Sequence, residues 1–236
     1  MQLYNRNVVI IGGSSGIGFA TAALAQAKGA TVTITGRAQD KLERAKEKLG
    51  AVKTAIVDIT NEMDVQQLMA QFDRIDHLVV LGASLASGKV VDTSLEELGR
   101  PIGERIWGAI YAVRYATPKM FDGSITLMSG LFSTRPLAGM AIAATAVGAI
   151  EAMSRALALE LAPVRVNAIA PGYIDTPLLQ AAFEDQYENV VKTQAAALPT
   201  KRIGTAEEAA SSILFLMTTG FITGEVLHLD GGGRYV

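Results

Sequence analysis

Short runs of apolar residues recur along the whole chain, and in several of them the apolar positions are consecutive rather than alternating. Consecutive apolar positions are typical of strands in a parallel sheet that helices cover on both faces, because neither side of such a strand meets water. The pattern predicts seven strands, at Asn7–Ile11, Thr31–Thr35, Lys53–Val57, His77–Leu81, Ser124–Met128, Val164–Ile169 and Glu225–Leu229.

The segments between these runs have the spacing of helices, including Gly16–Lys28, Gln39–Leu49 and Asn61–Phe72. Alternation of strand and helix implies right-handed crossovers. The pattern therefore predicts an α/β fold, a doubly wound (Rossmann) parallel seven-stranded sheet with helices on both faces, in a single domain over residues 1–236. One stretch, Gly172–Gly204, breaks the alternation. We expect it to be irregular and to form a substrate lid at about 172–204.

Composition excludes several functional classes. Hydrophobic residues make up 50% of the chain and charged residues 19%, which favours a large core over disorder. The net charge is −2 with acids and bases interspersed, which argues against binding to nucleic acid. The chain has no cysteine, and no group of His, Asp and Glu has the spacing of metal ligands, so no metal is expected.

The distribution of apolar and charged residues gives no sign of a membrane protein. The uncharged apolar stretch Leu137–Ile150 is too short to span a bilayer, and residues 1–6 lack the charged-then-apolar pattern of a signal segment. We therefore expect a cytoplasmic protein without a membrane partner.

A glycine-rich turn follows the first predicted strand and precedes the first predicted helix. Glycine lets the backbone turn sharply and approach a pyrophosphate, and the free amides at the helix start then meet its negative charge. A plain tight turn is the alternative, but the strand before and the helix after favour a dinucleotide site. The residues of this turn are Gly12, Gly13, Ser14, Ser15, Gly16, Ile17 and Gly18.

The end of the second strand indicates which dinucleotide binds. Sites for NAD place a carboxylate there for the ribose hydroxyls, but this chain has Gly36 followed by Arg37. A guanidinium makes charge-assisted bonds to a 2′-phosphate, so NADP(H) is the predicted cofactor, although Arg37 could also be a solvated residue that opens a helix. Asp58, after the third strand, is placed for an adenine amino group or for capping the next helix.

These motifs resemble the short-chain dehydrogenase/reductase (SDR) family over essentially the whole chain. Gly12, Gly16 and Gly18 are similar to its TGxxxGxG loop, with Ile11 in place of the threonine, and Asp58-Ile59-Thr60 is similar to its Asp-Val-Thr. The segment from Arg165 to Thr176 resembles the one that wraps the nicotinamide. The resemblance implies cofactor contacts from Pro171, Gly172, Ile174 and Thr176.

The residues that the family uses for catalysis are missing. The helix predicted at Met140–Leu161 aligns with the family helix that carries Tyr-x-x-x-Lys, and these positions hold Ala143 and Val147. They share one helix face because they are four residues apart. The family serine corresponds to Gly130, and the family asparagine corresponds to Arg105. In the family, the tyrosine is the general acid, the lysine lowers its pKa and holds the ribose, and the serine binds the carbonyl.

Other residues are candidates for the lost roles. Arg105 is long enough to cross the space left by the tyrosine and lysine, Ser129 lies beside Gly130, and Tyr173 is a phenol near the predicted nicotinamide site. Each has a structural alternative: Arg105 could reach solvent or pair with Glu104, Ser129 could face away from the site, and Tyr173 could pack under the lid.

Three further features are weighed against a role in catalysis. A literal Tyr-x-x-x-Lys at Tyr115–Lys119 is rejected because Pro118 interrupts it and it precedes the fifth strand. The two histidines, His77 and His228, fall in predicted strands and are expected to be structural, so hydrolase chemistry is disfavoured.

Two functions remain open from the sequence. One is an NADP(H)-dependent oxidoreductase that acts on a carbonyl/alcohol pair of a small-molecule substrate through an atypical active site. The other is a catalytically inactive NADP(H) binder, acting as a sensor or as a partner subunit. The resemblance also implies a homo-oligomer, a dimer or homotetramer, through helices around Ile106–Ala116 and Met140–Leu161.

Overall fold

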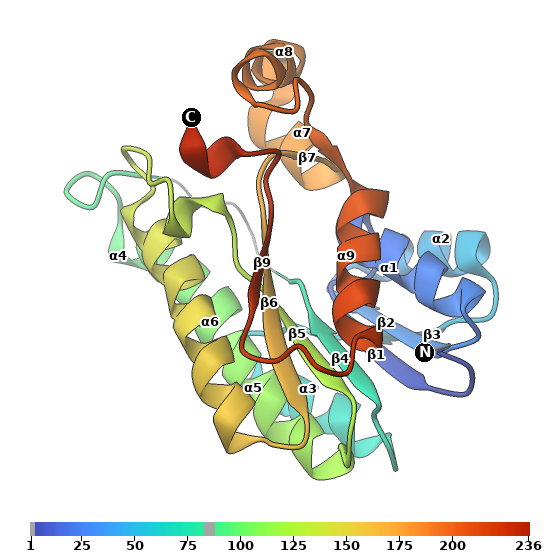
Figure 1. The fold of residues 1–236 in the computed structure, drawn as a ribbon. Helices are drawn as coiled ribbons and strands as arrows, with labels where there is room; N and C mark the ends of the chain where they lie inside the picture. Colours follow the sequence, from blue (N-terminus) through green and yellow to red (C-terminus); the bar gives the residue numbers. More distant parts are fainter. Residues whose placement is uncertain (1–2, 83–87) are drawn as a thin grey trace.

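The computed structural model describes residues 3–82 and 88–236. It contains a parallel sheet of seven strands in the order β3-β2-β1-β4-β5-β6-β9 (Figure 1). The predicted fold class is confirmed, and the strand ends lie within two residues of their predicted positions. The strands are β1 (Asn7–Ile11), β2 (Thr31–Gly36), β3 (Lys53–Ile56), β4 (His77–Val80), β5 (Ser124–Met128), β6 (Arg165–Pro171) and β9 (Val226–Leu229).

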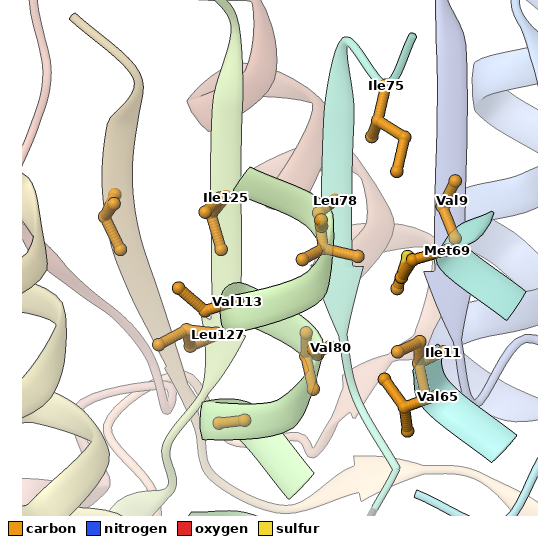
Figure 2. Close-up of a cluster of buried hydrophobic side chains, with 14 of the residues drawn as sticks. Val9, Ile11, Val65, Met69, Ile75, Leu78, Val80, Val113, Ile125 and Leu127 are labelled. Atoms are coloured by element: carbon orange, nitrogen blue, oxygen red, sulfur yellow. The ribbon is translucent and has the colours of Figure 1, made fainter. Parts of the chain in front are cut away.

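Helices cover both faces of the sheet (Figure 1). One face holds α1 (Gly16–Ala27), α2 (Gln39–Leu49) and α9 (Ala206–Thr218), with α1 and α9 side by side. The other face holds α3 (Glu62–Ala70), α5 (Gly108–Ala116) and α6 (Ala141–Glu160). Figure 2 shows part of this second core, where Val65 and Met69 of α3 and Val113 of α5 lie against the sheet. Burial on both sides explains why the strands are apolar at consecutive positions.

The stretch from residue 172 to 204 differs from the expectation of irregular structure. It contains β7 (Ile174–Asp175), α7 (Pro177–Phe183) and α8 (Tyr187–Ala197), and β7 pairs with β8 (Gly204–Thr205). Thr176 caps α7 by accepting a hydrogen bond from the Leu179 amide. No residue of the helix α8 is buried. Both helices lie beyond the carboxyl end of β6 (Figure 1).

A π-helix joins α4 (Leu95–Pro101) to α5, at Ile102–Trp107. Pro101 ends α4 and has no amide proton with which to continue the α-helical hydrogen bonds. Wide turns of this kind occur frequently at functional sites. This one carries Glu104 and Arg105 and packs against α6.

The helix α6 is long and apolar enough, by length and composition alone, to cross a membrane, which the shorter uncharged stretch in the sequence did not indicate. A single helix of this kind is weak evidence for a membrane span, since core helices have the same composition. This helix packs along β5 and β6. Within the chain, 33% of its apolar window is fully buried.

His77 lies at the start of β4, at the amino edge of the sheet. Its ring is buried, and Nδ1 lies 2.9 Å from the Ser124 hydroxyl. Burial lowers the pKa of His77 to about 4, so the ring is neutral at physiological pH. These contacts fit the structural role expected for this histidine.

Candidate functional site

The turn between β1 and α1 forms a cradle of backbone atoms. Gly12 and Gly16 have φ angles of 87° and 52°, a region that glycine adopts without strain. A Cβ on Gly12 would lie 2.9 Å from the Gly82 amide nitrogen, and a Cβ on Gly18 would overlap the Gly12 carbonyl oxygen. Ser15 precedes α1 and makes no side-chain capping bond, so the first amides of α1 point outward without that partner. Such a helix start fits a pyrophosphate.

The segment after β6 lies over this cradle. The Thr176 Cβ would be 3.3 Å from a Cβ on Gly16, which brings residues 16 and 176 together across the carboxyl edge of the sheet. Gly172 packs closely on the backbone of Asp230, where an added Cβ would lie 2.9 Å from the Asp230 Cα. Ile174 is buried. The residues taken from the two motifs therefore form one continuous site.

Arg37 lies between two carboxylates. Its Nη1 is 3.5 Å from Glu104 Oε1, and its side chain is 67% exposed whereas the Glu104 side chain is 5% exposed. Burial raises the pKa of Asp58, but hydrogen bonds from Thr60 and the charge of Arg37 outweigh it and hold that pKa below its usual value. Glu104, expected to be solvated or paired, is buried and paired because the π-helix turns it toward β2.

Arg105 extends from the π-helix toward the end of β5. Its Nη1 donates a long hydrogen bond, 3.5 Å, to the Met128 carbonyl oxygen. It lines a cavity of about 10 Å³, roughly the volume of one water molecule, together with Gly82 and Ile150. Burial lowers the pKa of Arg105 to about 10, and the Glu104 charge only partly offsets this effect. The guanidinium thus reaches α6 at Ile150, which is nearly one turn beyond Val147.

The wall formed by α6 is apolar where the sequence places Ala143 and Val147. Both residues are buried, and a Cβ on Gly130 would lie 3.5 Å from the Val147 Cγ1. The structure therefore brings these three positions together, as their alignment implied. Ala143 also lines a cavity of about 370 Å³ between α4 and the start of α6, which is large enough for a small molecule.

Ser129 lies against the same face of α6. It is buried, and its hydroxyl lies 2.7 Å from Glu151 Oε1 and 3.2 Å from the Val147 carbonyl oxygen. Its single proton is therefore held by α6. Glu151 was missed in the sequence, although its position eight residues after Ala143 and four after Val147 puts it on the same helix face.

Tyr173 lies partly buried beside Arg135, whose Nη1 donates to the Gly233 carbonyl oxygen at 3.0 Å. Burial raises the pKa of Tyr173, and the charge of Arg135 opposes that effect without cancelling it. The phenol is therefore protonated at neutral pH. Tyr115 points toward α3 instead of toward Tyr173: its hydroxyl donates a hydrogen bond to Glu62 of α3 at 2.6 Å.

Comparisons with known proteins agree with this geometry. A family model described as enoyl-(acyl carrier protein) reductase matches residues 12–233. A short-chain dehydrogenase/reductase, ucsE, from Acremonium sp is 30% identical over 98% of this chain and 96% of that protein. The 3-oxoacyl-[acyl-carrier-protein] reductase FabG of Chlamydia trachomatis is 33% identical over 98% of each chain.

One solved structure is also similar to the chain. It is an NADPH-bound short chain oxidoreductase from Pseudomonas aeruginosa, described as containing an atypical catalytic center. It is 25% identical, with a TM-score of 0.89 over 97% of this chain and 98% of that one.

Proposed function

Because the chain belongs to the short-chain dehydrogenase/reductase family, we propose that it binds NADP(H) and acts as an oxidoreductase on a carbonyl/alcohol pair through an atypical active site. The observation that carries the proposal is the intact cofactor half. The glycine cradle at Gly12 to Gly18 leaves room for a pyrophosphate beside α1, and Arg37 extends from β2 with most of its side chain exposed.

Each part of the site has a role in this proposal. The amides of Ser14 to Gly18 hold the pyrophosphate, Arg37 binds the 2′-phosphate, and Asp58 accepts a hydrogen bond from the adenine. The segment from Pro171 to Thr176 packs beside the nicotinamide. The bound cofactor supplies the hydride. The chain itself supplies orientation and an apolar wall at Ala143 and Val147 that excludes water.

The proton has to come from a group other than the family tyrosine. Tyr173 is the candidate, because it is a phenol within the segment from Pro171 to Thr176 and keeps its proton at neutral pH. Arg105 stabilises negative charge as a buried cation. Ser129 takes no part, since α6 holds its hydroxyl proton. The cavity beside Ala143 accepts the small-molecule substrate.

A second function is supported by the same wall. Ala143 and Val147 cannot donate a proton, and loss of a general acid typically costs ~10²–10⁴ in rate. An inactive NADP(H) binder, either a sensor or a partner subunit, would keep the cradle and lose the chemistry; the apolar residues at positions 143 and 147 support this alternative.

The test combines binding and turnover on one sample. We expect NADPH to bind at least ~10-fold tighter than NADH, because one charge-assisted contact to the 2′-phosphate contributes about 1.5 kcal/mol or more. In Arg37→Ala the two dissociation constants should become similar, whereas Arg44→Ala on α2 should leave their ratio unchanged. Equal constants in the native chain would contradict the choice of NADP(H).

The same sample is then assayed for NADPH oxidation with a panel of small carbonyl compounds. Binding with turnover supports the oxidoreductase, and turnover should be lost in Tyr173→Phe. Binding without turnover on any compound supports the inactive binder.

We also propose that the chain forms a homo-oligomer, a dimer or tetramer, through α5 and α6. Only 33% of the apolar window of α6 is fully buried, and Trp107, 52% exposed, stacks on Tyr111 of α5. An apolar helix that its own chain covers only in part favours a partner surface. Light scattering at micromolar concentration should give at least twice the mass of one chain, and Ala149→Arg should reduce it. A monomer would refute this assembly.

A further inference from the structure

We propose that Glu104 determines the cofactor preference of this site by competing with the 2′-phosphate of NADP(H) for the Arg37 guanidinium. This inference rests on the proposed NADP(H) function and adds a specificity-determining residue to it. Glu104 comes from the π-helix before α5, whereas the other groups at the adenosine end come from the ends of β2 and β3.

The place of Glu104 at the adenosine end follows from its neighbours. A Cβ on Gly103 would lie 3.9 Å from the Thr60 Cγ2, and a Cβ on Gly108 would lie 2.6 Å from the Ile59 Cγ1. The π-helix therefore lies over the residues that follow β3, among them Asp58.

The two members of the ion pair differ in their freedom to move. The Glu104 carboxylate is fixed by burial, at 5% exposure, while the Arg37 side chain is 67% exposed. Arg37 is thus the member that moves when another anion arrives. A 2′-phosphate has to draw this guanidinium away from Glu104 or share it, and the uncharged 2′-hydroxyl of NADH leaves the pair intact.

Acidic residues outnumber Arg37 at this end of the site before any cofactor binds. Arg37 supplies one positive charge, and the nearby acids are Glu104, Asp58 and Asp64, whose Oδ2 accepts a hydrogen bond from the Asp58 amide at 3.0 Å. A phosphate monoester brings ~−1.5 to −2 charges to a place with no net positive charge. Removal of the Glu104 charge takes one negative charge away from Arg37, which favours NADPH and has little effect on NADH.

Glu104 could instead hold Arg37 in the orientation that the phosphate needs. The distance of 3.5 Å argues against a strong orienting effect, because charge-assisted bonds of this type are usually ~2.7–2.9 Å long. Competition for the guanidinium is therefore the larger effect. When the Glu104 charge is removed, competition predicts tighter NADPH binding, whereas loss of orientation predicts weaker NADPH binding.

The test is Glu104→Gln, which keeps the shape of the side chain and removes its charge. Dissociation constants for NADPH and NADH are measured by fluorescence titration for the native chain, Glu104→Gln, Arg37→Ala and the double variant. We expect the NADPH constant to fall at least ~5-fold in Glu104→Gln and the NADH constant to stay within ~2-fold. In the Arg37→Ala background, Glu104→Gln should have no effect on either. Glu96→Gln, an exposed acid on α4, is the matched control.

Several outcomes would overturn the inference: an unchanged or weaker NADPH affinity in Glu104→Gln, an equal gain for NADH, or a gain that persists without Arg37. If Glu104→Gln does not fold, Glu104→Asp withdraws the carboxylate from Arg37 and should give a gain of at least ~2-fold by the same argument. A native chain that binds neither dinucleotide refutes the proposed function itself, whereas a native chain that prefers NADPH with no response at Glu104 refutes this inference alone.

Discussion

Gly18→Ala is expected to weaken NADPH binding at least ~100-fold. The added methyl group would overlap the Gly12 carbonyl oxygen and press on the Gly12 carbonyl carbon and the Gly13 Cα, all of them backbone atoms. Backbone cannot rotate away as a side chain can, so the β1–α1 turn has to open. The cradle that holds the pyrophosphate would then lose its shape. A displacement of about 1 Å in a group that positions a ligand can cost ~100-fold.

The measurement is titration with NADPH, accompanied by thermal unfolding to show that the variant is folded. Gly220→Ala is the control, because a Cβ at that position meets no atom within 4 Å and the residue does not have a positive φ. Native-like NADPH affinity in a folded Gly18→Ala protein would show that this turn does not hold the cofactor.

Arg105→Met is expected to raise the free energy of unfolding by about 3 kcal/mol at neutral pH. The pKa of Arg105 is lowered to about 10, more than two powers of ten in proton affinity, and each power of ten corresponds to ~1.4 kcal/mol. The lowered pKa already includes the attraction to Glu104, so the cost of burying the cation exceeds that attraction. Methionine fills a similar volume without a charge.

The pH dependence has a definite sign. Because the folded protein disfavours the Arg105 cation, the penalty is fully present below pH ~10 and is relieved as the pH rises above that value. A stabilised Arg105→Met protein should also bind NADPH more weakly, by at least ~5-fold, because a cation beside the predicted nicotinamide site has gone. An arginine that costs stability and supports binding is what a functional site would retain.

Arg165→Met is the matched control for this measurement. Burial lowers the pKa of Arg165 too, but its guanidinium donates to the carbonyl oxygens of Leu216, Met217 and Ile222 at 2.7–3.0 Å. Methionine would leave these carbonyls without their donor, at ~1–3 kcal/mol for each buried acceptor. We therefore expect Arg165→Met to lose stability. A loss in both variants would show that Arg105 is held by contacts as favourable as those of Arg165.

The sequence predicted the sheet because its strands are buried on both faces and their apolar runs are uninterrupted. It predicted the cradle because a glycine-rich turn between a strand and a helix is typical of a phosphate-binding loop. The helices of residues 172–204 were missed, although Tyr187, Val190 and Val191 of α8 have helical spacing, because the two helices are short and α8 buries no residue.

The contacts of single side chains were harder to predict. The π-helical turn at Ile102–Trp107 rotates Glu104 into the protein, and helix periodicity gives no warning of such a turn. Ser129 and Glu151 are distant in sequence and meet only because β5 and α6 pack together. Arg37 was correctly placed at the end of β2, but its pairing with Glu104 depends on a segment 67 residues away.

The order of the strands has a consequence for how the chain folds as it is synthesised. After β1, β2 and β3 have formed one side of the sheet, β4, β5, β6 and β9 each add to the same growing edge in the order in which they leave the ribosome. Every new strand therefore finds its partner already made, and unpaired edges are exposed only briefly. Gly172, however, packs on Asp230, which follows the last strand. The contact of Gly172 with Asp230 therefore forms only after Asp230 has emerged, so most of the sheet precedes this part of the proposed binding site in the order of synthesis.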